Sequence, residues 1–167
     1  MRKQKGFSLI ELLLVVAVIL IIAAIAVPNF LRSRMAANEA SAVGSLHNIE
    51  SAQVAYASSY PTIGFASNLN TLGPGPIPGN QTATSENAVL LDSVLGCTAG
   101  VGTTPCQKSG YGFYVTVVSA TPISVYSINA DPISPGQSGQ RHFFSDPSGV
   151  IRYNMSTTAT DTDTPIE

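Results

Sequence analysis

The first part of the chain carries a nearly continuous apolar run. Residues 7–27 hold 19 apolar side chains in 21 positions, and only Ser8 and Glu11 interrupt them. A helix of that length measures roughly 31 Å, close to the hydrocarbon thickness of a bilayer. The pattern therefore predicts a membrane-spanning helix over residues 7–28, ended or bent by Pro28, which lacks a backbone donor and clashes with the preceding turn.

A second helical pattern follows over residues 29–57. Its apolar positions are separated by sums of three- and four-residue steps and so share one helical face. They are Met35, Ala42, Leu46, Ile49 and Tyr56. Glu39 and Gln53 interrupt this stripe. We expect one long helix over residues 7–57, with a kink or local melting near Pro28 and with its second half packed on a globular head.

The next segment, residues 58–110, is predicted to be a long connecting loop. Between Pro61 and Gly110 it contains 5 Pro and 8 Gly in 50 positions. Short helical turns are expected at residues 66–72 and 86–95, the second packing Leu91 and Leu95 on the head.

After Gly110 the apolar period changes to two, which indicates β-strands. Four strands are expected, at residues 111–119, 123–130, 140–145 and 150–154, with a type I turn at Asp146-Pro147-Ser148-Gly149. The fold class is therefore α+β: a long N-terminal helix packed on an antiparallel sheet of about four strands in residues 111–155. Residues 156–167 show no apolar pattern and are expected to form a flexible tail.

Charge sets the direction in which the chain crosses a membrane. Three cations, Arg2, Lys3 and Lys5, precede the apolar run, so the positive-inside bias keeps the N-terminus cytoplasmic and exports the remainder. Export places the two cysteines, Cys97 and Cys106, in an oxidising compartment, which favours a disulfide between them.

Composition excludes several function classes. Only 11 % of residues are charged, the net charge is −2, and no basic face indicates a nucleic-acid site. No motif indicates a catalytic centre, a metal site or a cofactor.

Two ordinary interpretations of the N-terminal run remain open at this point. A secretory signal peptide would be cut after Ala26, because Ala24-Ile25-Ala26 provides small residues at the required spacing. A plain membrane anchor is the other, although Glu11 would then cost roughly 2.5–3.5 kcal/mol deep in lipid.

The segment Lys5-Gly6-Phe7-Ser8-Leu9-Ile10-Glu11-Leu12-Leu13 resembles the prepilin cleavage motif of type IV pilins and type II secretion pseudopilins. The similarity continues through the apolar run to Val27-Pro28-Asn29-Phe30. It implies that residues 1–6 are a leader peptide, that a prepilin peptidase cuts between Gly6 and Phe7, and that the new Phe7 amine is N-methylated. It also implies a pilin fold.

The resemblance implies a structural subunit that polymerises into an extracellular type IV pilus for adhesion, twitching motility or DNA uptake. Glu11 of an incoming subunit would pair with the Phe7 amine of a neighbour. The expected partners are further copies of the chain and other pilins in a helical filament, the peptidase, the inner-membrane assembly platform and the membrane itself, crossed once before assembly. The alternatives are a pseudopilin of a periplasmic pseudopilus and a secreted binding protein released by signal peptidase.

Mass spectrometry of the mature protein distinguishes these interpretations. Prepilin processing predicts a chain that begins with methylated Phe7 and retains the apolar run. A mature chain beginning at Val27 would identify a signal peptide and rule out assembly through that run.

Overall fold

The computed structural model describes residues 7–75, 82–97 and 105–166. The leader residues 1–6, including Gly6, lie outside this range, as do two parts of the predicted connecting loop. The elements are α1 (Leu9–Ser59), α2 (Leu69–Leu72), β1 (Cys106–Lys108), β2 (Tyr111–Val117), β3 (Tyr126–Pro132), β4 (His142–Ser145), β5 (Arg152–Asn154) and β6 (Thr164–Pro165).

The chain divides into two units at Arg34 and Met35. The first, here called the N-terminal unit (residues 7–34), consists of the apolar half of α1. The second, the head (residues 35–166), contains the rest of α1 and all other elements. The helical assignment continues through Pro28, so the expected local melting at this residue does not occur in the structure.

The head contains one antiparallel sheet in the order β1-β2-β3-β4-β5-β6. This meander confirms the α+β arrangement, but it has six strands where the sequence pattern predicted about four. The added strands are the short β1 and β6 at the two edges, too short to show a period of two. The predicted turn joins β4 to β5, with the N–H of Gly149 donating to the carbonyl of Asp146 at 3.0 Å.

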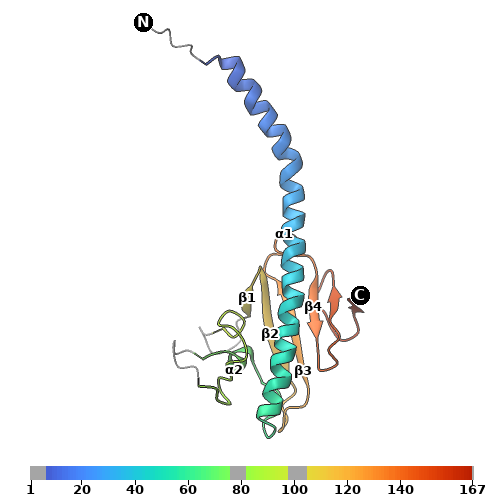
Figure 1. Ribbon diagram of the computed structural model, residues 1–167. Coiled ribbons are helices and arrows are strands. Elements are labelled where there is room, and N and C mark those ends of the chain that lie inside the picture. The colour runs from blue at the N-terminus through green and yellow to red at the C-terminus, as the bar shows by residue number, and fades with distance from the viewer. Residues whose placement is uncertain (1–6, 76–81, 98–104, 167) are drawn as a thin grey trace. The chain divides into compact units, whose positions relative to one another are not determined.

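The core lies between α1 and one face of the sheet (Figure 1). The helix contributes small and medium apolar side chains at the predicted spacing, and the sheet contributes large ones from β2, β3 and β4. The fully buried large members are Leu46, Ile49 and Tyr56 of the helix and Tyr111, Phe113, Ile128 and Phe143 of the sheet. Burying each of these contributes roughly 1.5–3 kcal/mol to folding.

The connection between helix and sheet differs in part from the expectation. The turn predicted at residues 66–72 is present as α2, capped by Asn68, whose Oδ1 accepts from the N–H of Thr71. The helix predicted at residues 86–95 is absent. The N–H groups of Ala88 and Leu90 donate instead to the carbonyls of Thr71 and Leu72, and this pairing replaces the bonds that a helix would make.

The C-terminal segment also differs from the frayed tail that its sequence indicated. Strand β6 pairs with β5, and the N–H of Ile166 donates to the carbonyl of Ile151 at 2.9 Å. Ala159 is buried, and its carbonyl accepts from Nδ2 of Asn129. These polar contacts attach the segment to the sheet without an apolar pattern, so hydrophobic periodicity did not reveal them.

Two glycines provide a test of the close packing in the connection. A Cβ added at Gly73 would lie 2.7 Å from the Cα of Gly96, which is backbone and cannot give way cheaply. We expect Gly73→Ala to destabilise the full chain in detergent by roughly 1–3 kcal/mol, measured by thermal unfolding.

The matched control is Gly44→Ala on α1, where an added Cβ meets nothing within 4 Å. Because alanine favours a helix, this change is expected to stabilise by roughly 0.5–1 kcal/mol. Equal effects of the two substitutions would contradict the close approach of Gly73 to Gly96.

Candidate assembly helix and its docking contacts

The predicted processing and assembly residues Phe7 and Glu11 lie at the beginning of α1. The carbonyl of Ser8 accepts the N–H groups of Glu11 and Leu12, so the helix starts within two residues of Phe7. Phe7 is 75 % exposed, and Glu11 lies exposed in the first helical turn. The Glu11 carboxylate has no hydrogen bond or ion pair among the residues that the structure describes. Its carboxylate is available to a partner from outside the chain.

The apolar side chains of the N-terminal unit have no cover within the described chain. From Phe7 to Leu31 the large hydrophobic residues are 44–77 % exposed, on every side of the helix. The helix is long and apolar enough to cross a membrane by length and composition. A surface of this kind requires either lipid or other apolar helices around it.

Pro28 lies inside α1, where the missing N–H removes one backbone hydrogen bond. At the next residue, the side-chain amide of Asn29 donates to the carbonyl of Ile25 at 3.2 Å. This bond pairs a polar side chain with the helix backbone at the end of the apolar run.

Glu39 attaches the start of the head's helix to the sheet. One carboxylate oxygen accepts the N–H of Gln140 at 2.9 Å, and the other accepts Nε of Arg141 at 2.7 Å. Its side chain is 11 % exposed. Burial alone would raise the pKa of Glu39, but the N–H of Gln140 and the Arg141 guanidinium outweigh that effect and hold the pKa below its usual value.

Gln53 attaches the helix to the connection. Its side chain is fully buried, with Nε2 donating to the carbonyl of Ala66 at 3.0 Å and Oε1 accepting the N–H of Ala66 at 2.8 Å. The side-chain amide of Gln53 therefore uses both its donor and its acceptor on the backbone of one residue, as two paired strands do. The two polar residues that interrupted the apolar stripe therefore each bind chain packed against the helix and help to position it.

A third buried polar contact joins α1 to β4. The hydroxyl of the buried Ser145 donates to Glu50, whose second oxygen lies 3.2 Å from Nδ1 of His47. Burial, with the carboxylates of Glu50 and Asp146 adding to it, raises the pKa of the neighbouring Tyr126 to about 12.

The predicted disulfide is present between Cys97 and Cys106, with their Cα atoms 5.4 Å apart. Cys106 is buried at the start of β1 and Cys97 ends the turn that contains Leu95. The bond therefore ties the end of the connection to the edge of the sheet.

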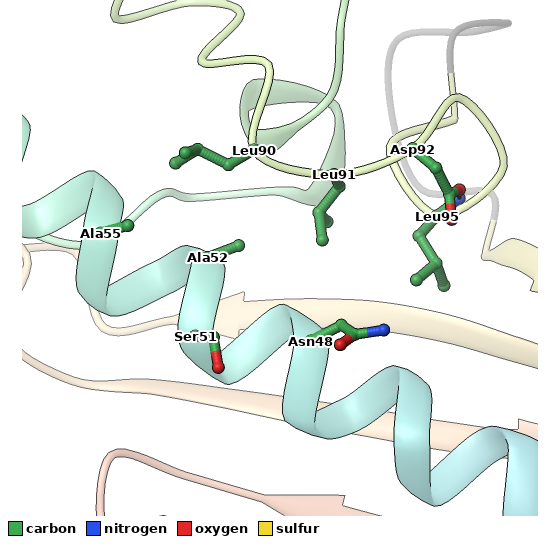
Figure 2. Close-up of a pocket in the computed structure, with 8 residues that line it drawn as sticks. All are labelled: Asn48, Ser51, Ala52, Ala55, Leu90, Leu91, Asp92 and Leu95. Atoms are coloured by element: carbon green, nitrogen blue, oxygen red, sulfur yellow. Dashed lines mark hydrogen bonds between the residues drawn. The ribbon is translucent and has the colours of Figure 1, made fainter.

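The connection and α1 border an open groove of about 320 Å³ (Figure 2). Figure 2 shows Leu91 and Leu95 pointing toward the helix, in agreement with the packing predicted for them. The N–H of Leu95 and the Lys108 ammonium hold the pKa of Asp92 below its usual range. Both carboxylate oxygens of Asp92 therefore already have partners within the head. The lining residues are Asn48, Ser51, Ala52, Ala55, Leu90, Leu91, Asp92 and Leu95.

A polar cluster lies on three adjacent strands. Asp131 of β3 accepts the hydroxyl of Tyr114 at 2.7 Å and lies 2.6 Å from Nδ1 of His142. Among the described residues, no group of three or more His, Cys, Asp or Glu side chains is placed to hold a metal. The cluster contains one His and one carboxylate, and their side chains link β3 to the strands on either side of it.

The sequence pattern identified Glu39 and Gln53 only as interruptions. It identified neither Gln140 and Arg141 as the partners of Glu39 nor Ala66 as the partner of Gln53. The available signal was a charged or amide side chain on the buried face of an amphipathic helix. Such a residue needs a partner, because burial of an unpaired polar group is costly.

Comparison with known proteins places these features in context. A family model described as the prokaryotic N-terminal methylation motif matches residues 1–27. The chain is 34 % identical over 132 residues to the type IV wide pilus major component PilA4 of Thermus thermophilus, covering 74 % of this chain and 98 % of that protein. It is 35 % identical over 90 residues to the type IV major pilin protein PilA of Myxococcus xanthus, covering 54 % of this chain and 40 % of that protein. No solved structure matches the chain significantly.

The Glu39 contact predicts a pH dependence of stability. Because the pKa of Glu39 is lowered from its ordinary value of 4.5, its stabilising contribution is complete above that pH and is lost as the pH falls through the folded-state value. Glu39→Gln should destabilise by roughly 1–3 kcal/mol at pH 7 and should flatten the loss of stability below pH 4.5.

Denaturant unfolding between pH 3 and pH 7 measures both effects, with the exposed Glu86→Gln as the matched control. If Glu39→Gln has the same pH profile as the control, the ion pair does not stabilise the head.

Proposed function

The chain belongs to the type IV pilin family, and we propose on this basis how its N-terminal helix takes it from the membrane into a filament. The protein is a pilus subunit that begins as a membrane-anchored precursor and assembles into pili with other pilins. The pseudopilin alternative is not favoured. The observation that carries the proposal is the uncovered apolar surface from Phe7 to Leu31 directly after the methylation motif.

In the precursor, the cationic leader stays on the cytoplasmic side and the apolar helix crosses the inner membrane. Prepilin peptidase cuts between Gly6 and Phe7, and the new amine is methylated. The absence of a side chain on Gly6 allows the backbone to enter a narrow peptidase site in an extended conformation. The assembly platform then receives a subunit whose helix is intact.

In the filament, other copies replace the lipid around the helix. Because the surrounding helices are as apolar as lipid tails, burial alone fixes no axial position for the incoming subunit. Pairing of Glu11 with the Phe7 amine of a neighbour supplies one, since a buried carboxylate is tolerated when a cation meets it at close range. The exposure of Glu11 in the described chain supports this role.

The chain serves as a major subunit for adhesion, twitching motility or DNA uptake. Both curated relatives are named as major pilins or major pilus components, which supports this assignment. Its role is structural: subunits of this kind act by assembly, and we propose no catalytic residue. The partners are further copies of this chain, other pilins, the peptidase and the assembly platform.

Shearing of cells and analysis of the released filaments tests the proposal. We expect the chain to be abundant in the sheared fraction without residues 1–6. Glu11→Gln should be processed and inserted in the membrane, but it should be absent from filaments, because the amide carries no charge to pair with the amine.

The matched control is again Glu86→Gln, which removes one exposed carboxylate from the head and should assemble normally. Normal filaments from Glu11→Gln would contradict the register role of Glu11 while leaving the family unchanged.

A further inference from the structure

Two of the cations in the described chain have no acceptor. The five Lys and Arg residues there are Arg32, Arg34, Lys108, Arg141 and Arg152. In the head, Lys108 meets Asp92, Arg141 meets Glu39, and Arg152 donates to the carbonyl of Asp163. Arg32 and Arg34 are exposed and make no hydrogen bond or ion pair within the described residues.

These two arginines lie directly after the apolar run. Residues 12–31 contain no charged side chain, and Glu11 and Arg32 stand at its two ends. The 21 residues of rise from Glu11 to Arg32 span roughly 32 Å along a helix, against about 30 Å for the hydrocarbon core of a bilayer. With Glu11 at one interface, Arg32 and Arg34 fall in the headgroup layer of the opposite one.

The spacing of the pair discriminates between possible acceptors. Positions i and i+2 on an α-helix lie about 200° apart around the axis but only about 3 Å apart along it. One protein surface on one side of the helix therefore cannot meet both guanidinium groups. A layer of lipid headgroups surrounds the helix at a single depth and meets both.

We propose that Arg32 and Arg34 form a collar that binds phospholipid phosphate groups at the outer face of the inner membrane and fixes the depth of the precursor helix. The inference rests on the membrane stage of the proposed function. Guanidinium groups bind phosphate oxygens through paired hydrogen bonds, and long basic side chains at helix ends extend toward the interface. The collar holds Phe7 and Glu11 at the cytoplasmic interface, where cleavage and methylation occur.

Removal of the leader changes which end of the helix the lipid holds. Before cleavage, three leader cations lie on the cytoplasmic side and two arginines on the other. Afterwards the cytoplasmic end carries one amine and the Glu11 carboxylate, which sum to no net charge. The net positive charge beside the apolar run then lies at the collar, on the side toward which the subunit leaves the membrane.

The chain contains no Trp, so a single introduced Trp reports depth without background. Phe30, 67 % exposed and two residues before Arg32, is the position for it. Full-length Phe30→Trp is placed in phosphatidylcholine vesicles with or without phosphatidylglycerol, and its fluorescence is quenched by lipids brominated at defined depths. The test variant adds Arg32→Gln and Arg34→Gln, the conservative variant adds lysines at both positions, and the control adds Lys108→Gln and Arg152→Gln.

We expect the reporter and the control to be quenched most by bromines near the headgroups, with a sharper profile when phosphatidylglycerol is present. The double Gln variant should show no sharpening of the profile by phosphatidylglycerol, and its quenching should spread toward the bilayer centre. The double Lys variant should retain most of the sharpening. An unchanged profile in the double Gln variant overturns the collar. A response that follows the protein-to-lipid ratio instead of lipid charge also overturns it, because the acceptor is then a carboxylate of a second copy.

The same measurement separates failure of the collar from failure of the membrane stage. Quenching of the reporter at some depth shows insertion, whatever the arginines bind. An unquenched reporter at every depth would contradict insertion itself, and with it both proposals.

Discussion

One helix face organises the head. The buried residues of α1 from Ala42 to Tyr56 are the surface on which β2, β3 and β4 place their large side chains, and the connection adds Leu69, Leu72 and Leu95 to the same core. The same helix begins with residues that nothing in the described chain covers. One continuous helix therefore supplies both the buried face of the head and the uncovered apolar surface of the N-terminal unit, with the division between Arg34 and Met35.

This division of the helix also explains its composition. The first half presents apolar side chains in all directions, as the proposed surroundings of lipid and neighbouring helices require. The second half needs one apolar face, and it needs polar residues on that face to select a single position against the sheet. Glu39 and Gln53 favour one position of the helix against the sheet, since each has hydrogen-bond partners at only one place in the head.

The sequence predicted the features that depend on periodicity and on local chemistry. The helix, its buried stripe, the turn at Asp146 and the pairing of Cys97 with Cys106 belong to this class, and the structure contains them. The partners of Glu39, the strands β1 and β6 and the attachment of Ala159 depend on contacts between distant segments. The predicted helix at residues 86–95 was wrong for the same reason: its N–H groups found acceptors in residues 71–72, which lie close only after folding.

At the N-terminal end of α1, the roles that the motif predicts for Phe7 and Glu11 stay predictions, and the structure adds their surroundings. The Glu11 carboxylate is exposed and unpaired within the described chain, which is compatible with its proposed role. Arg32 and Arg34 received no role from the motif, because their significance appears only when every other described cation proves to have an acceptor.

The contacts of Glu39 and Gln53 have a mechanical consequence. They are 14 residues apart, about 21 Å along the axis of α1, and both cross from the helix to chain packed against it. A pull along the axis therefore loads the two contacts and the apolar layer between them in shear, all at once, instead of peeling them apart in sequence. Resistance of the head to such a pull is set by the barrier to this concerted rupture, and not by the equilibrium free energy of unfolding.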